Sequence, residues 1–69
     1  MATGDDFGTN LKRIREEAGL SQEDLMDLAG VHRTQISEYE RGKRVPKVGT
    51  VERLSRALGV PFGEFFAAG

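Results

Sequence analysis

Apolar residues recur along most of the chain at the three- and four-residue spacings that place them on one face of a helix. The first such run predicts a helix over about residues 6–18, with an inward face formed by Phe7, Leu11, Ile14 and Ala18. Asp5 or Asp6 can cap its start, and Gly19 supplies the left-handed residue that ends it. Apolar and polar residues nowhere alternate over the length of a strand. The pattern therefore predicts an all-α protein.

Two short helices are expected next, joined by a tight turn. One covers about residues 21–29 and starts with a serine cap followed by acidic residues, which the helix dipole favours in a first turn. Residues 30–32 form the turn, and the other helix covers about residues 33–41. The expected inward-facing residues are Leu25 and Leu28 in the first of these helices and Ile36 and Tyr39 in the second. Two helices joined in this way are the core of a helix-turn-helix.

The last third of the chain is also expected to be helical. Residues 43–47 form an extended basic loop, because Pro46 disfavours helical backbone at the residue before it. A fourth helix is predicted over about residues 48–58, with an inward face formed by Val48, Val51, Leu54, Ala57 and Leu58. Pro61 suits the first turn of a short fifth helix, in which Phe62, Phe65 and Phe66 can close the core. The prediction is a compact five-helix bundle, a single domain over residues 1–69 with an ordered core at about 6–66.

Length and composition limit the chemistry that such a bundle can perform. Sixty-nine residues lie near the lower limit for an unaided hydrophobic core, and no cysteine is present to form disulfides or a thiolate zinc site. His32 is the single histidine, so we expect no metal site and no cofactor. An enzyme is disfavoured, because so short a chain has little room for a substrate pocket. No apolar run approaches the roughly 18 residues that span a bilayer, so a soluble, intracellular protein is expected.

The net charge of −1 hides a gradient along the chain. Residues 1–30 carry three basic and seven acidic side chains, a balance of −4, whereas residues 31–56 carry seven basic and three acidic side chains, a balance of +4. A field of one sign over part of a small protein can steer an anionic partner even when the total charge is near zero. The positive half contains the second helix of the two-helix turn and the basic loop.

The residues around the two-helix turn are more specific than the turn itself. Four stretches carry the pattern, AGLSQEDL at 18–25, AGV at 29–31, ISEYERGKRVP at 36–46 and LSRALGV at 54–60. In this order and without insertion, they resemble the phage repressor/Cro-type helix-turn-helix family, the XRE-like transcriptional regulators. The resemblance covers about residues 6–66. It implies a lambda-repressor-like DNA-binding domain whose helix 33–41 enters the major groove.

The resemblance also implies roles for individual residues. The base-reading positions are Arg33, Thr34, Ser37 and Glu38. The positions expected to contact DNA phosphates are Gln22, Arg41, Lys43, Arg44 and Lys47. Arg15 and Glu40 match a pair that the family often uses as an ion pair between its first and third helices. His32 replaces the usual Ser- or Thr-like cap, so we expect a weaker cap there and include His32 among the phosphate-contacting candidates.

The side-chain chemistry agrees with these roles. An arginine at the start of a recognition helix, here Arg33, can donate two hydrogen bonds to guanine O6 and N7. Glu38 can accept from cytosine N4, and Thr34 or Ser37 can contact several bases. As a negative charge on the DNA-facing surface, Glu38 is expected either to repel phosphates or to act as a specificity filter. The basic loop supplies affinity and position with little sequence information.

Two classes of function are left open. The first is a sequence-specific transcriptional regulator, or its DNA-binding domain, that binds a (pseudo)palindromic operator in double-stranded DNA as a homodimer, since one recognition helix reads only a few base pairs. Its candidate dimer interface is formed by Phe62, Phe65 and Phe66. The alternative is an antitoxin-type or other protein-interaction module, which the acidic first half motivates. A protein partner, or an effector domain C-terminal to this segment, is also left open, and the expected location is the cytoplasm, associated with the nucleoid and not with a membrane.

Overall fold

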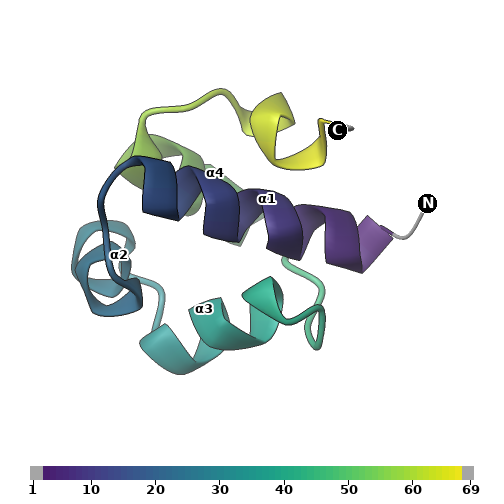
Figure 1. Cartoon of the computed structure of the whole chain (residues 1–69), viewed down its shortest axis with the longest axis horizontal. Helices are drawn as coiled ribbons and strands as arrows, with labels where there is room; N and C mark the ends of the chain where they lie inside the picture. The colour runs from purple at the N-terminus through teal and green to yellow at the C-terminus, as the bar shows by residue number, and fades with distance from the viewer. Residues whose placement is uncertain (1–2, 68–69) are drawn as a thin grey trace.

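The computed structural model describes residues 3–67 of the chain. Its elements, in chain order, are α1 (Thr3–Glu17), α2 (Gln22–Ala29), α3 (Arg33–Glu40), α4 (Val48–Leu58) and the 3-10 helix η1 (Phe62–Phe66). Helix α1 runs through the middle of the molecule, with α3 packed against one side of it and η1 against the other (Figure 1). Helix α2 packs against both α3 and α4, and α4 also contacts η1. Helices are the only regular elements in the described part of the chain.

The hydrophobic core draws residues from every element. Its buried members are Phe7, Leu11, Ile14, Leu25, Ala29, Val31, Ile36, Tyr39, Val51, Leu54 and Phe65. The Phe7 ring lies at the junction of three elements, because it meets Tyr39 of α3 edge-on at a centroid distance of 5.8 Å and Phe65 of η1 at 5.6 Å. Each fully buried aromatic or aliphatic side chain stabilises the fold by about 1.5–3 kcal/mol relative to an exposed one. The core therefore ties α1 to α3 and to η1, the last element of the chain.

The final element differs from the predicted fifth α-helix. Among residues 3–67 there are four α-helices, and Phe62–Phe66 forms a 3-10 helix in which the amide of Glu64 donates to the carbonyl of Pro61 over 3.0 Å. A five-residue segment has room for very few i to i+4 bonds, which favours the tighter helix. The side chain of Asn10 donates to the carbonyl oxygens of Phe65 (2.8 Å) and Ala67 (3.1 Å) and so holds the end of this turn against α1. The five-helix count was wrong in this respect.

The other predicted helices are present, with corrections at their ends and faces. Helix α1 begins at Thr3, three residues before the predicted start, so Asp5 and Asp6 lie inside it and not at its cap. Leu28 and Val48 were predicted to face inward, but their exposed fractions are 60% and 66%. Both lie at a helix end, where the described elements do not cover them. Residues 1, 2, 68 and 69 of the predicted domain lie outside the described residues.

Helices α1 and α3 approach each other closely at Gly8. A Cβ atom built on Gly8 would lie 2.2 Å from the carbonyl oxygen of Tyr39 and 3.1 Å from that of Glu40. Both neighbours are backbone atoms at the end of α3, so neither can move away as a flexible side chain would. The crossing of the two helices therefore requires a glycine at this position. The apolar pattern of the sequence gave no indication of this contact.

Candidate nucleic-acid interface

Helix α2 starts with a complete capping box. The Ser21 hydroxyl accepts from the amide of Asp24 (2.9 Å), and the amide of Ser21 donates to the Asp24 carboxylate (3.0 Å). These two contacts satisfy amide groups that the first turn of a helix leaves without partners. The hydrogen bond from the Ser21 amide, with a smaller contribution from the Ser21 side chain, also holds the pKa of the Asp24 carboxyl below its ordinary value. The cap fixes where Gln22, the first residue of α2, projects.

The turn between α2 and α3 is three residues long. Gly30 ends α2 in the left-handed conformation at φ 72°, and its amide donates to the carbonyl of Met26 over 2.9 Å. Val31 inserts into the core, and His32 then caps α3. The Nδ1 atom of His32 accepts from the amide of Thr34 over 3.0 Å, so the ring carries its hydrogen on Nε2. The cap that the sequence suggested to be weak is present, with a ring nitrogen in place of a hydroxyl oxygen.

Helix α3 has one buried and one outward face. Ile36 and Tyr39 lie in the core. The predicted base-reading residues lie on the remaining surface, where Arg33 and Thr34 are exposed and Ser37 and Glu38 are half-buried. Their spacing of three and four residues places them in one stripe along the helix. The structure therefore brings the four candidates together on a surface that a ligand can reach.

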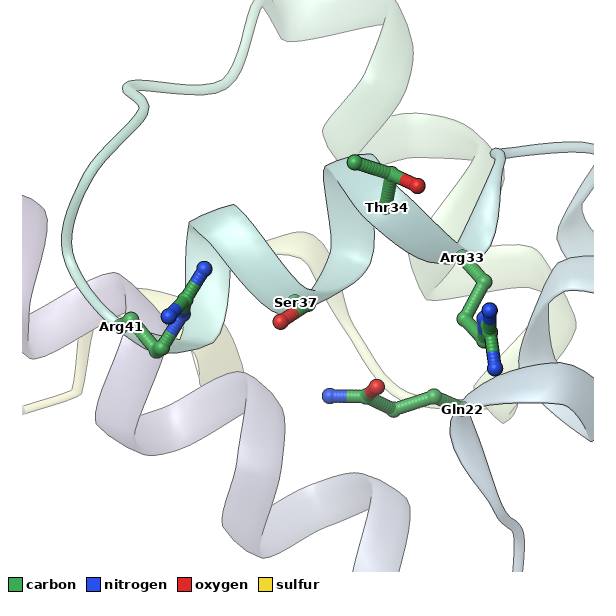
Figure 2. A pocket seen from close by; sticks show the side chains of 5 residues that line it. All are labelled: Gln22, Arg33, Thr34, Ser37 and Arg41. Carbon is green, nitrogen blue, oxygen red and sulfur yellow. The ribbon is translucent and has the colours of Figure 1, made fainter.

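A shallow hollow lies between the start of α2 and the outward face of α3. It has a volume of about 210 Å³ and is lined by Gln22, Arg33, Thr34, Ser37 and Arg41. Figure 2 shows Gln22 extending from α2 toward Ser37, with the guanidinium group of Arg33 above its base and Arg41 at the far end of α3. Two of these residues were predicted to contact phosphate and three to read bases. All five can supply N–H or O–H donors to an anionic or polar partner.

The predicted pair of Arg15 and Glu40 is the most buried charged contact of the described chain. Arg15 Nε lies 2.7 Å from Glu40 Oε2 and Nη2 lies 3.1 Å from Oε1, with 10% and 4% of the two side chains exposed. Arg15 also donates from Nη1 to the carbonyl of Leu20 over 2.8 Å. The hydrogen bond to Glu40 raises the pKa of Arg15, against the opposing effect of burial. The pair thus links α1, the end of α3 and the segment before α2.

Gln22 belongs to the same network. Its Nε2 donates to Glu40 Oε1 over 3.1 Å, so Glu40 receives hydrogen bonds from α1 and α2 at once. The family resemblance implied only a phosphate contact for Gln22, so this second role was not predicted. An amide nitrogen carries two hydrogens, and only one of them is used by Glu40. Glu40 therefore orients the side chain that lines the hollow while leaving it a free donor.

The end of α3 is closed by a pair of backbone hydrogen bonds. The amide of Gly42 donates to the carbonyl of Tyr39 (3.1 Å), and the amide of Lys43 donates to that of Glu38 (2.8 Å), with Gly42 in the left-handed conformation. This is the Schellman arrangement, which reverses the chain direction over the last helical turn. It places the first residues of the basic loop beside Glu38.

Arg44 consequently binds Glu38. Arg44 Nε donates to Glu38 Oε1 over 2.7 Å, and this hydrogen bond raises the pKa of Arg44. Arg33 makes a looser ion pair, 3.5 Å from the Glu23 carboxylate on α2. Two of the cations predicted to contact DNA are therefore paired with carboxylates of the same surface. Arg41, Lys43 and Lys47 are exposed, and no ion pair within the described chain involves them.

The three aromatic candidates for a dimer contact separate into two groups. Phe65 is fully buried inside the chain and cannot form an interface, which corrects the prediction for this residue. Phe62 and Phe66 are 42% and 49% exposed, and their rings contact each other in a tilted arrangement at a centroid distance of 5.7 Å. Phe66 also contacts Phe7 at 5.7 Å. They form an apolar patch on η1, on the opposite side of α1 from α3 (Figure 1).

Among the described residues, no three His, Cys, Asp or Glu side chains lie close enough together to hold a metal ion. Within the same part of the chain, every helix is too short or too polar to cross a membrane.

Comparison with known proteins connects this geometry to a family. Residues 11–65 match the family described as Helix-turn-helix. The chain is 43% identical over 53 residues to the uncharacterized HTH-type transcriptional regulator y4dJ of Sinorhizobium fredii, covering 77% of this chain and 69% of that protein. It is 42% identical over 65 residues to the HTH-type transcriptional repressor RghR of Bacillus subtilis, covering 91% of this chain and 48% of that protein. The chain thus spans about half the length of RghR.

Solved structures agree with this relationship. The restriction-modification controller protein C.AhdI from Aeromonas hydrophila superposes with a TM-score of 0.90 at 35% identity, over 96% of this chain and 100% of that one. The controller protein C.Esp1396I, solved as a tetramer in complex with its natural 35-base-pair operator, superposes with a TM-score of 0.85 at 32% identity, over 96% of this chain and 87% of that one.

Proposed function

The chain belongs to the helix-turn-helix family, and from this premise we propose that it is a sequence-specific DNA-binding transcriptional regulator with α3 in the major groove of its operator. The observation that carries the proposal is the stripe of polar side chains on the outward face of α3, bordered by the hollow between α2 and α3. A helix that presents such a stripe fits the width of the major groove of B-DNA. The family to which the chain belongs consists of DNA-binding regulators and not of enzymes.

Base reading is assigned to the outward face of α3, at Arg33, Thr34, Ser37 and Glu38. Arg33 is the candidate for a bidentate contact with guanine, because it stands at the N-terminal end of the helix. Its ion pair with Glu23 is long and exposed, so the guanidinium group can exchange this carboxylate for a base edge at little cost. Glu38 is the candidate acceptor for cytosine N4.

Phosphate contacts are assigned to Gln22, His32, Arg41, Lys43, Arg44 and Lys47. Gln22 offers the amide hydrogen that Glu40 does not use. His32 offers Nε2–H, since its Nδ1 accepts from the amide of Thr34 and the two ring nitrogens lie on different sides of the ring. Lys43 and Lys47 of the basic loop add charge without sequence preference.

We further propose that the regulator binds as a homodimer through the exposed rings of Phe62 and Phe66. One recognition helix reads only a few base pairs, so a second copy about one helical turn away is needed for specificity. The element that carries the patch, η1, lies across α1 from α3 (Figure 1), so a contact through η1 leaves α3 free for DNA. The relative C.Esp1396I was solved as a tetramer on its operator, which supports assembly on DNA. Residues 6–66 then act as one DNA-binding unit in the cytoplasm, at the nucleoid.

The alternative, a module that binds only proteins, is not favoured. The named relatives are transcriptional regulators, repressors and restriction-modification controllers. The charge balance of −4 over residues 1–30 suits a basic protein partner for the DNA-bound form.

Selection of bound duplexes from a random pool, at low and at physiological salt, tests the proposal. A palindrome with half-sites about 10 base pairs apart is the expected product. Arg33→Ala should then lower affinity by about 1–3 kcal/mol and relax the preference at one base position, whereas Lys43→Ala should weaken all sequences about equally. No enrichment at either salt would contradict DNA recognition by this chain. An unchanged affinity of Arg33→Ala for the selected operator would contradict the orientation of α3.

A further inference from the structure

Glu38 and Arg44 both lie on the proposed DNA-binding surface, yet in the free chain they bind each other. The Nε–Oε1 distance of 2.7 Å is as short as that of the buried Arg15–Glu40 pair. About half of the Arg44 side chain and a third of the Glu38 side chain remain exposed, so solvent and DNA can reach both groups. The backbone bond from Lys43 to Glu38 holds the loop in the position that makes the contact.

We propose that the Glu38–Arg44 pair is a specificity gate, a contact that keeps Arg44 from DNA phosphates until a base of the operator replaces it at Glu38. This inference rests on the proposed function. On DNA of unrelated sequence, the carboxylate of Glu38 retains Arg44, and the chain binds with one phosphate contact fewer. On the operator, an exocyclic amino group such as cytosine N4–H donates to Glu38, and the released guanidinium group binds a phosphate. Each correct base contact at this position then adds a phosphate contact.

The strength of the pair suits such an exchange. An exposed ion pair is weak enough to be displaced, whereas a buried one is not. A carboxylate on a DNA-facing helix also carries a cost when no donor meets it, because it then lies near phosphates of the same charge. Pairing with Arg44 removes that cost on unrelated DNA, and pairing with a base removes it on the operator. The two states differ in the partner of Glu38 and in the availability of Arg44.

The other ion pair of this surface does not offer the same coupling. Arg33 lies 3.5 Å from Glu23, without a hydrogen bond, and both side chains are more than half exposed. Glu23 projects from α2 and not from the stripe of α3. When Arg33 leaves Glu23, the Glu23 carboxylate is therefore hydrated and gains no contact with a base.

A simpler explanation is that Glu38 repels phosphates at a distance, whatever the state of Arg44. A double-mutant cycle of Glu38→Gln and Arg44→Gln separates the two, because only a gate makes the effect of one substitution depend on the other. The matched control is Glu64→Gln, which makes the same charge change on η1, across α1 from α3 (Figure 1). The measurements are affinities and salt dependences for the selected operator and for a scrambled duplex of equal length. Circular dichroism melts verify that each variant is folded.

On the scrambled duplex, Glu38→Gln should raise affinity about threefold to fivefold, the factor that corresponds to an exposed ion pair. It should also steepen the salt dependence by about 0.9, the slope of one added phosphate contact. Both effects should be absent in the Arg44→Gln background. Arg44→Gln alone should flatten the salt dependence of binding to the operator, where Arg44 contacts a phosphate. It should leave the salt dependence on the scrambled duplex unchanged, because Glu38 holds Arg44 there. The ratio of operator to scrambled affinity should fall in Glu38→Gln and stay at its original value in Glu64→Gln.

Two results would overturn the gate. If the gain of Glu38→Gln persists in the Arg44→Gln background, Glu38 acts by repulsion alone. If Glu38→Gln binds scrambled DNA no better than Glu64→Gln does, the pair does not restrain Arg44. Failure of the original chain to bind any selected duplex would instead contradict the proposed function, so the two failures are distinguishable.

Discussion

Two regions of this molecule use the same chemical contact for different purposes. In the seam between α1 and α3, Arg15 and Glu40 pair at 2.7 Å with at most a tenth of either side chain exposed. On the outward surface of α3, Glu38 and Arg44 pair at the same distance with far greater exposure. The distance is identical, so it cannot tell the two roles apart. Exposure to solvent and the number of additional partners decide whether an Arg–Glu pair holds the fold together or remains exchangeable.

The two pairs also differ in what surrounds them. Glu40 accepts from Arg15 and from Gln22, and Arg15 donates in addition to the carbonyl of Leu20. All of the buried side-chain polar atoms in the described part of the chain have hydrogen-bond partners. The seam is therefore a fully satisfied polar network, in which loss of one member leaves another charge buried and unpaired. The outer pair has water as an alternative partner on both sides.

The largest expected effect comes from breaking the buried pair. Arg15→Ala leaves the Glu40 carboxylate buried without its cation and should lower the free energy of unfolding by about 3–5 kcal/mol. A domain of this size has a total stability of only about 3–10 kcal/mol, so the variant should be near or below its folding threshold. Urea denaturation followed by circular dichroism at low temperature measures the change.

The outer pair supplies the matched control for this experiment. Arg44→Ala removes the same side chain from a contact of the same length and should lower the free energy of unfolding far less than Arg15→Ala does, because solvent screens an exposed pair. Arg15→Lys, which keeps the charge but not the planar array of donors, should fall between the two. Equal losses of unfolding free energy for Arg15→Ala and Arg44→Ala would contradict the claim that solvent exposure decides which pair stabilises the fold.

A second test addresses the steric side of the seam. Gly8→Ala places a methyl group where the carbonyl oxygen of Tyr39 already lies and should cost about 1–3 kcal/mol through the forced separation of α1 and α3. Gly49→Ala is the control, because a Cβ at Gly49 in α4 meets nothing within 4 Å. A helical glycine with free space should gain up to about 1 kcal/mol on replacement by alanine. Denaturation curves in which Gly8→Ala matched the original chain would show that the two helices can separate freely at this point.

The features that the sequence predicted correctly are those with a local cause. The order of the four α-helices follows from the three- and four-residue spacing of apolar side chains. The Ser21 cap and the left-handed glycines that end the helices depend only on nearby backbone groups. The buried face of α3 followed from the spacing of Ile36 and Tyr39, whereas the four residues on its outward face were named from the family resemblance.

The features that could not be predicted depend on residues far apart in the chain. The close approach at Gly8 and the hydrogen bond from Asn10 to Phe65, 55 residues away, leave no periodic signal. Periodicity also cannot show whether a neighbouring element covers an apolar face, which is why Leu28 and Val48 are exposed against expectation. The pairing of Glu38 with Arg44 was missed because it requires the chain reversal after α3. Sequence alone placed both residues on the DNA-facing surface without relating them.

The smallest expected effect concerns His32. This residue is exposed, like the Glu38–Arg44 pair, but it also caps the start of α3. Its Nδ1 satisfies the amide of Thr34 in the first turn of α3, so His32→Ala should lower the free energy of unfolding by about 1 kcal/mol, the typical value of a helix cap. His32→Ser restores an acceptor at the same position and should keep the stability of the original chain, as measured by urea denaturation. Serine lacks the Nε2–H, however, so the same variant should lose one hydrogen bond to a phosphate and bind DNA more weakly, with an unchanged salt dependence because a neutral ring displaces no counterion. A serine variant with unchanged stability and weakened DNA binding would show that the His32 ring both caps α3 and contacts DNA. Unchanged DNA binding by this variant would show that His32 only caps α3 and, like Arg15 and Glu40, serves the fold alone.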